Sequence, residues 1–298
     1  MDKALPLAGA ADPAQVLLAP MQRSVRRRGF ARRYPTLIAG AAILLVAIAA
    51  AVFGPLLTPY DPTGVDVLHT LAGPLTPGHP LGTDAFGRDI LSRILNGARI
   101  DLAIAFGATI VTATTGTLIG LASGYFGGRV DTVIMRIVDI FFAFPFFVLV
   151  IALISVLGLG ITSMFVAIWL TGWITYTRII RAETLVARKQ EYSVAARALG
   201  YSHPRVMARH ILPNVLAPAI IFSMVDAVGN ILLGSALGFL GLGAQPPSPE
   251  WGAMIADGQP YMLSAWWLPT MPGLAIVIVA AGFSLFGDGL ADLLRPGR

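Results

Sequence analysis

Few residues in this chain could perform covalent chemistry. The four histidines do not form the HExxH spacing that places two zinc ligands on one helix face, and no Gly-x-Ser-x-Gly turn presents a nucleophilic serine. A phosphate-binding loop needs a lysine directly after glycine, but Lys3 and Lys189 follow Asp2 and Arg188. The absence of cysteine excludes disulfides, thiolate catalysis and cysteine-bound metals. We therefore expect no catalytic residue, no metal site and no bound cofactor, and any ATP must be hydrolysed by another protein.

Polar residues inside apolar stretches are the stronger candidates, because charges in such surroundings are costly and often functional. Asp226 is followed by Asn230 at helical spacing, which predicts either a polar patch on a translocation cavity or an interhelical hydrogen bond. Asp139 is a further tentative cavity residue, although Arg136, three residues earlier, is a suitable partner on the same helix face. Two further aspartates lie near the ends of apolar stretches and are expected at the membrane interface: Asp101 and Asp288.

A polar stretch at residues 191–214, EYSVAARALGYSHPRVMARHILPN, predicts two short helices. The first places small or apolar residues on one face: Tyr192, Ala195, Ala196 and Leu199. Gly200 suits the position just after a helix end, and Pro204 suits the first turn of a second helix capped by Ser202 or His203. Such a compact helix would fit a groove on a partner, or form a helical loop with no partner. Periodicity leaves both open.

The elements that position these residues are membrane helices. Of the 298 residues 56% are hydrophobic and only 12% are charged, about half the charged share of a typical soluble domain, and the mean hydropathy is +0.74. Open strands are excluded in lipid because their backbone groups would stay unpaired. A spanning helix needs about 20 apolar residues. Six stretches qualify: 36–57, 100–126, 132–157, 161–180, 215–242 and 271–293. The chain is therefore predicted to be an all-α integral membrane protein with six transmembrane helices.

The basic residues predict the orientation of these helices. All but three of the 21 lysines and arginines lie in the tail 1–35, the turn after the second span, the loop between spans four and five, or the C-terminus. Such residues concentrate on the cytoplasmic side, so both termini and the 191–214 loop are predicted to be cytoplasmic. The run RSVRRRGFARR at 23–33 is then an anchor at the membrane surface and not a nucleic-acid site. The first apolar run begins too late for a cleaved signal peptide.

Glycines repeat every four residues in two of the spans, at Gly116, Gly120 and Gly124 and again at Gly234 and Gly238. Small residues at this spacing let two helices approach closely, which predicts a helix bundle with a subunit interface along these stripes.

Proline marks a weak point in the third span. Five phenylalanines surround Pro145, which is expected to kink the helix as part of a gate or as a tolerated irregularity.

Two outer segments are too polar to span. The first, 79–99, predicts an interfacial amphipathic helix that Thr83 or Asp84 caps. The second, 243–270, is a proline-stiffened loop whose tryptophans are expected at the headgroup level.

The 191–214 segment resembles the EAA signature of ABC-importer permeases, which reads Glu-Ala-Ala, three residues, Gly and later Ile-x-Leu-Pro. The matching residues are Ala195, Ala196, Gly200, Leu212 and Pro213. Val194 stands in place of the motif's glutamate, and His210 stands at its isoleucine position. Together with GTDAFGRDILSR, GGRVD and FLGLG, the segment is most similar to the C-type subunit of dipeptide, oligopeptide and nickel permeases, over residues 36–298.

The resemblance implies a type I permease bundle in the bacterial inner membrane, non-catalytic, with a cytoplasmic coupling helix. It implies three kinds of partner: a second permease subunit in a heterodimer, two cytoplasmic ATPases that use ATP and Mg²⁺, and an outer substrate-binding protein. The implied ATPase-coupling residues are Glu191, Tyr192, Ala195, Ala196, Arg197, Gly200, Arg209 and Pro213.

The implied cargo is di- or oligopeptides, with nickel, glutathione or another small solute as alternatives. The rival from a different class is a secondary transporter driven by an ion gradient. Such a transporter would be expected to show internal repeats and buried charges, and the sequence shows no repeated halves and few such charges.

Overall fold

Long apolar runs form the main helices of the protein. The computed structural model describes residues 33–294, in which the chain from Tyr34 onward is one compact unit. Five helices in this part are long and apolar enough to cross a membrane, and a bent helix pair makes six if it counts as one span. The five are α3 (Pro35–Leu57), α4 (Ile90–Phe126), α7 (Ile161–Ala187), α10 (Leu212–Phe239) and α12 (Trp267–Leu294). The described residues contain no strand, and almost all of the predicted basic anchor lies outside them.

The predicted third span is two helices. Residues 128–157 form α5 (Gly128–Phe142) and α6 (Phe146–Leu157), which meet at an angle of 89°. Pro145 is the N-cap of α6 and has an extended backbone (ψ 122°), so the helical path is interrupted there. The position of the break was predicted from Pro145. The prediction of one kinked but continuous helix over 132–157 was wrong.

The second span starts ten residues earlier than predicted. Asp89 caps α4 through its carboxylate, which accepts a hydrogen bond from the backbone N–H of Ser92 at 2.7 Å. The separate interfacial helix predicted for 79–99 is therefore wrong, because its apolar residues are the first turns of the spanning helix. Thr83 and Asp84 do not cap a helix. They lie in the preceding loop, where Asp84 accepts from Nε of Arg88 at 2.6 Å.

The glycine stripe of α4 packs inside the chain. A Cβ added at Gly116 would lie 2.3 Å from the carbonyl oxygen of Trp173, and one at Gly120 would lie 2.6 Å from that of Thr177. Gly124 meets the next turn of the same helix, α7. The stripe predicted for a subunit interface is thus occupied by the protein's own helix.

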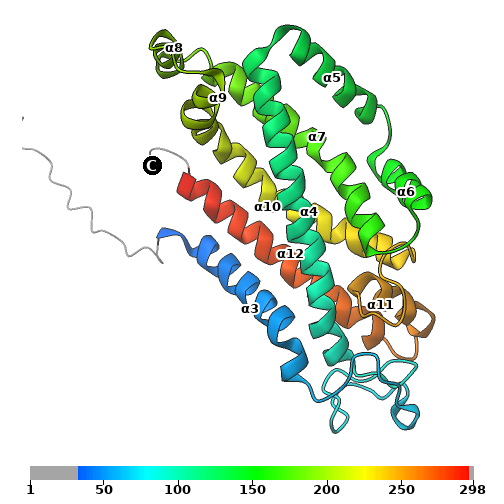
Figure 1. The fold of residues 1–298 in the computed structure, drawn as a ribbon. Helices are drawn as coiled ribbons and strands as arrows, with labels where there is room; N and C mark the ends of the chain where they lie inside the picture. The colour runs from blue at the N-terminus through cyan, green and yellow to red at the C-terminus, as the bar shows by residue number, and fades with distance from the viewer. Residues whose placement is uncertain (1–32, 295–298) are drawn as a thin grey trace, which may run out of the picture. The chain divides into compact units, whose positions relative to one another are not determined.

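The two segments predicted to lie outside the membrane form a folded layer at one end of the bundle. This layer contains η1 (Val67–His69), α11 (Trp251–Gly258) and η3 (Gln259–Tyr261). It lies at the opposite end from α8 (Glu191–Ala198) and α9 (His203–Val206) (Figure 1). The 243–270 segment was predicted as a stiff loop, but it includes α11. Trp251 is 2% exposed and donates from Nε1 to the carbonyl of Ile94, so it is a core residue and not a headgroup anchor.

Candidate functional site

The predicted pair of short helices exists at the end of α7. Here α8 (Glu191–Ala198) is followed by α9 (His203–Val206), with Ser202 as N-cap, and by one π-helical stretch, η2 (Met207–Ile211), that leads into α10. Gly200 has a φ of +80°. The N–H of Tyr201 bonds to the carbonyl of Ala196 and that of Gly200 to the carbonyl of Arg197, which is the Schellman arrangement. The predicted helix stop at Gly200 is confirmed.

The two faces of α8 differ sharply in exposure. Ser193 and Ala196 are buried, at 2% and 3%. Tyr192, Ala195 and Leu199 are exposed, and the Leu199 side chain is 75% exposed. The sequence placed all three with Ala196 on one face, which was wrong for Ala196. Ala196 packs against the bundle, while Tyr192, Ala195 and Leu199 form an uncovered, partly apolar face.

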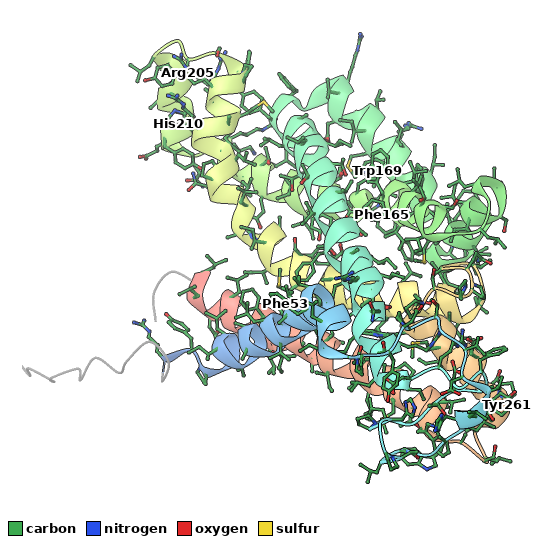
Figure 2. The ribbon with its side chains drawn as sticks, turned by 60° about the horizontal axis from the view of Figure 1, so that its bottom comes forward. Phe53, Phe165, Trp169, Arg205, His210 and Tyr261 are labelled. Carbon is green, nitrogen blue, oxygen red and sulfur yellow. The ribbon has the colours of Figure 1, made fainter. Side chains whose placement is uncertain are left out.

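Several contacts hold this segment rigidly against the bundle. Ala196, Val206 and Ile211 belong to one buried cluster with side chains of α7 and α10. The hydroxyl of Tyr125, on α4, hydrogen-bonds to Nδ1 of His203 at 2.9 Å. The ring of His210 stacks on Tyr201, and Figure 2 shows His210 and Arg205 together at this end of the molecule.

The remaining predicted coupling residues, all exposed, take two kinds of position. Arg197 donates to the carbonyl of Tyr201 at 2.7 Å and so closes the turn after α8. The others are exposed and lie along the segment: Glu191 in the first turn of α8, Arg209 in η2 and Pro213 in the first turn of α10.

The base of the segment includes contacts that the sequence reasoning missed. Asp131 at the start of α5 binds Arg181 of α7. Nη1 of Arg188 donates to the carbonyl of Tyr125 at 3.1 Å. Both arginines were assigned only to the orienting positive charge. The sequence contained one indication of the Asp131–Arg181 pair. Asp131 is the one acidic residue in a turn that is predicted on the same side of the membrane as a strongly basic loop.

Asp226 and Asn230 form hydrogen bonds between helices. Oδ2 of Asp226 accepts from the hydroxyl of Tyr176 at 3.0 Å, and Nδ2 of Asn230 at 3.2 Å. Nδ2 of Asn230 also donates to Oγ1 of Thr109 at 2.9 Å. This cluster therefore joins α10 to α4 and α7, as the hydrogen-bond alternative predicts, and its role on a translocation cavity stays a prediction.

Of the other three span acids, two have surroundings different from those expected. Asp139 binds Nη2 of Arg178 at 2.7 Å, so its partner is on α7 and not Arg136 of its own helix. Asp101 is 1% exposed and accepts from the backbone N–H of Trp251 at 3.2 Å, so it is not interfacial. Asp288 is exposed near the end of α12.

Comparisons with known proteins agree with this architecture. Residues 116–298 match the family described as binding-protein-dependent transport system inner membrane component, and residues 28–74 match the N-terminal TM domain of oligopeptide transport permease C. A probable D,D-dipeptide transport system permease of Escherichia coli K12 is 40% identical over 88% of both chains. A glutathione transport system permease of Pectobacterium atrosepticum is 39% identical over 90% of this chain and 89% of its own.

One solved structure is similar in fold. The inward-facing MetNI methionine ABC transporter contains a chain with a TM-score of 0.55 and 16% identity, which covers 68% of this chain and 96% of that one. At this identity the likeness concerns the fold alone.

Proposed function

The chain belongs to the family of binding-protein-dependent transport system inner membrane components, and we propose that it forms half of the transmembrane pathway of an ATP-driven importer of short peptides. A second permease subunit would complete the pathway. An outer binding protein would deliver the peptide, and two cytoplasmic ATPases would supply the energy.

The choice of short peptides rests on the relatives. Their names give D,D-dipeptides, dipeptides, di- and tripeptides and glutathione as cargo. Glutathione is itself a tripeptide, so one chemical class covers all of them. This favours peptides over nickel or another small solute.

The α8 face is the observation that carries the coupling role. Tyr192, Ala195 and Leu199 are uncovered on a helix that is otherwise fixed by Ala196 and by the Gly200 turn. An apolar face on a rigid, short helix suits a groove of a separate protein. We assign this face to contact with an ATPase, with Glu191 and Arg209 as polar contacts at its edges.

Orientation follows from the same assignment. If α8 meets the ATPase in the cytoplasm, the layer that contains η1 and α11 faces outward, where a binding protein would dock. Helix directions then place the start of α3 and the end of α12 on the cytoplasmic side, in agreement with the distribution of basic residues.

The test is uptake of a radiolabelled dipeptide by cells of the host that lack this gene and carry it on a plasmid. Wild type should restore uptake, and Leu199→Asp should lower it at least about tenfold, equivalent to about 1.4 kcal/mol of lost docking. Leu199→Met is the matched control, since it keeps the apolar contact. Both variants should reach the membrane in equal amounts.

The source of energy separates the two classes of transporter. ATP depletion at constant membrane potential should stop uptake, whereas an uncoupler at constant ATP should not. Uptake that follows the ion gradient instead would refute the ATP-driven importer, and normal uptake by Leu199→Asp would refute the role of the α8 face.

A further inference from the structure

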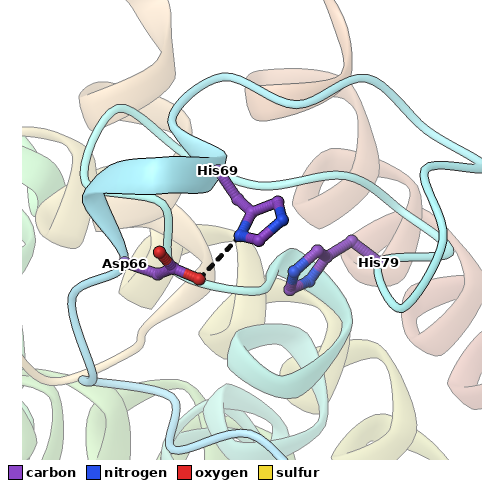
Figure 3. A group of neighbouring side chains, drawn as sticks. All are labelled: Asp66, His69 and His79. Carbon is purple, nitrogen blue, oxygen red and sulfur yellow. Dashed lines mark hydrogen bonds and ion pairs between the residues drawn. The ribbon is translucent and has the colours of Figure 1, made fainter.

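Three side chains that the proposed function does not use meet at the outer end of the molecule. Asp66 is the N-cap of η1, His69 is its last residue, and His79 lies in a turn ten residues farther on (Figure 3). Each offers one ligand atom, and these atoms all lie within 4.8 Å of one another. No sequence motif predicts this group, because the fold of the loop, and not helical spacing, brings the residues together.

The buried member of the group, His79, is held in one orientation by a carboxylate. Nδ1 of His79 lies 2.9 Å from Oδ1 of Asp89, and both side chains are at least 95% buried. Oδ2 of Asp89 also caps α4, and its Oδ1 faces Nδ1 of His79, so Nε2 is the ring nitrogen that this contact leaves for an ion. A histidine oriented by a carboxylate in this way is the usual arrangement behind a metal ligand. Among the described residues, no hydrogen bond is made to Nε2 of His79.

The other two members are adjustable. Oδ1 of Asp66 accepts from the N–H of Leu68 at 3.0 Å, and Oδ2 lies 2.7 Å from Nδ1 of His69. Their side chains are 43% and 46% exposed. Ligand atoms around a tetrahedral zinc ion are about 3.3 Å apart, given bonds of about 2.0–2.1 Å. Both side chains are half exposed and so have room to rotate toward this geometry.

We propose that Asp66, His69 and His79 bind a divalent transition-metal ion, for which Zn²⁺ is the natural probe. Two imidazoles and one carboxylate suit zinc and its neighbours, whereas Mg²⁺ and Ca²⁺ prefer oxygen ligands alone. The fourth position is left to water. A bound ion would join η1 to the turn at His79, and through Asp89 to the start of α4.

Local structure without a metal ion explains only part of this arrangement. The Asp66–His69 contact is an ordinary i,i+3 pair beside a helix cap. It does not require a third ligand that is buried, oriented by a second carboxylate and left with a lone pair. The metal site accounts for all three residues together.

The experiment uses the purified full chain in detergent, with an affinity tag that contains no histidine. Equilibrium dialysis against Zn²⁺ should give one ion per chain, and Co²⁺ should give the visible absorption of a tetrahedral nitrogen–oxygen site. His69→Ala and Asp66→Asn should each weaken binding at least about tenfold. Asp66→Asn keeps the acceptor for the Leu68 N–H, so its loss of binding would not reflect a lost cap.

The other two histidines provide the control. His203→Ala/His210→Ala removes the remaining imidazoles, both near α9, and should leave the binding constant unchanged. Wild type that binds no ion, or His69→Ala that binds as tightly as wild type, would overturn the proposal. Loss of binding in the double control would place the ion at the opposite end of the molecule. None of these results depends on peptide uptake.

Discussion

Arg181 of α7 holds Asp131, at the start of α5, through two hydrogen bonds. Nη2 of Arg181 lies 2.6 Å from Oδ2 of Asp131, Nε bonds to Oδ1, and the hydroxyl of Ser123 donates to Oδ1 at 2.6 Å. The paired side chains are 29% and 19% exposed. The contact thereby fixes the turn after α4, where α5 of the broken span begins, to the helix that precedes α8.

Removal of either partner should destabilise this junction. Asp131→Ala leaves the Arg181 guanidinium without its acceptor, and we expect a loss of about 1 kcal/mol, less than for a fully buried pair because water reaches both groups. The measurement is the thermal unfolding midpoint in detergent, followed by tryptophan fluorescence. Asp131→Ala/Arg181→Ala should cost less than the sum of the two single substitutions. Strict additivity would show that the two side chains do not interact.

The residues tolerated at Gly200 should be limited by the backbone conformation alone, and not by a lack of space. Its φ of +80° disfavours most side chains, yet an added Cβ would meet no atom within 4 Å. Gly200→Asn should therefore be tolerated better than Gly200→Val, because asparagine enters the left-handed region at lower cost. We expect peptide uptake to fall in the order glycine, asparagine, valine, with equal membrane insertion for all three. Equal uptake by the valine variant would show that the α8 turn does not orient the coupling face.

The close approach of α4 to α7 has a matched control within the chain. Gly120→Ala puts a methyl group 2.6 Å from the Thr177 carbonyl oxygen, whereas Gly229→Ala on α10 meets nothing within 4 Å. The first should lower stability by about 1–3 kcal/mol, as overpacking does, and the second should be neutral or slightly stabilising. Thermal midpoints in detergent compare them directly. Equal effects would mean that helix propensity, and not the α4–α7 contact, determines the result.

Much of this architecture follows from local sequence. Apolar length predicts where helices cross, since nothing else satisfies a backbone in lipid. Gly200 predicts the end of α8, because only the local backbone decides that turn. Pro145 likewise marks the break between α5 and α6. The 89° angle at the break does not follow from proline itself, because the direction of α6 depends on what it packs against.

Features that depend on distant residues were not predictable in the same way. The burial of Asp101 requires α11, whose Trp251 is 150 residues away. Asp139 pairs with Arg178 because α7 passes beside α5, although Arg136 is nearer in sequence. The Asp66, His69 and His79 group needs a loop of irregular backbone to form. In each case tertiary packing determines the partner. The spacing of residues along one helix carries no information about that packing.

Asp226 offers a way to separate packing from transport. Asp226→Asn keeps an acceptor oxygen for Tyr176 and should leave the thermal midpoint almost unchanged. Asp226→Leu removes the acceptor that Tyr176 and Asn230 share and leaves them only Ser223 and Thr109 as partners, so it should cost about 1 kcal/mol. Uptake by the asparagine variant then tests the predicted cavity role, and we expect it to fall. Full uptake with full stability would assign Asp226 to helix packing alone.

Glu250 should make the stability of the layer that contains η1 and α11 sensitive to pH. Its carboxylate is fully buried and caps α11, accepting from the N–H groups of Gly252 at 2.7 Å and Ala253 at 2.8 Å. Burial raises the pKa of Glu250 above its ordinary value of 4.5, and these two bonds offset the rise only in part. The buried carboxyl of Asp101 interacts with the same group.

The folded protein therefore binds this proton more tightly than the unfolded chain. The resulting stability is fully present below the unfolded pKa, about 4.5, and is lost as the pH rises through the raised folded pKa. We expect the thermal midpoint of wild type to fall over that pH window. Glu250→Gln, which is always neutral and keeps one acceptor, should show a shallower slope. Glu191→Gln, at an exposed position of α8, is the control and should follow wild type. Identical slopes for wild type and Glu250→Gln would show that the Glu250 carboxyl does not carry the effect.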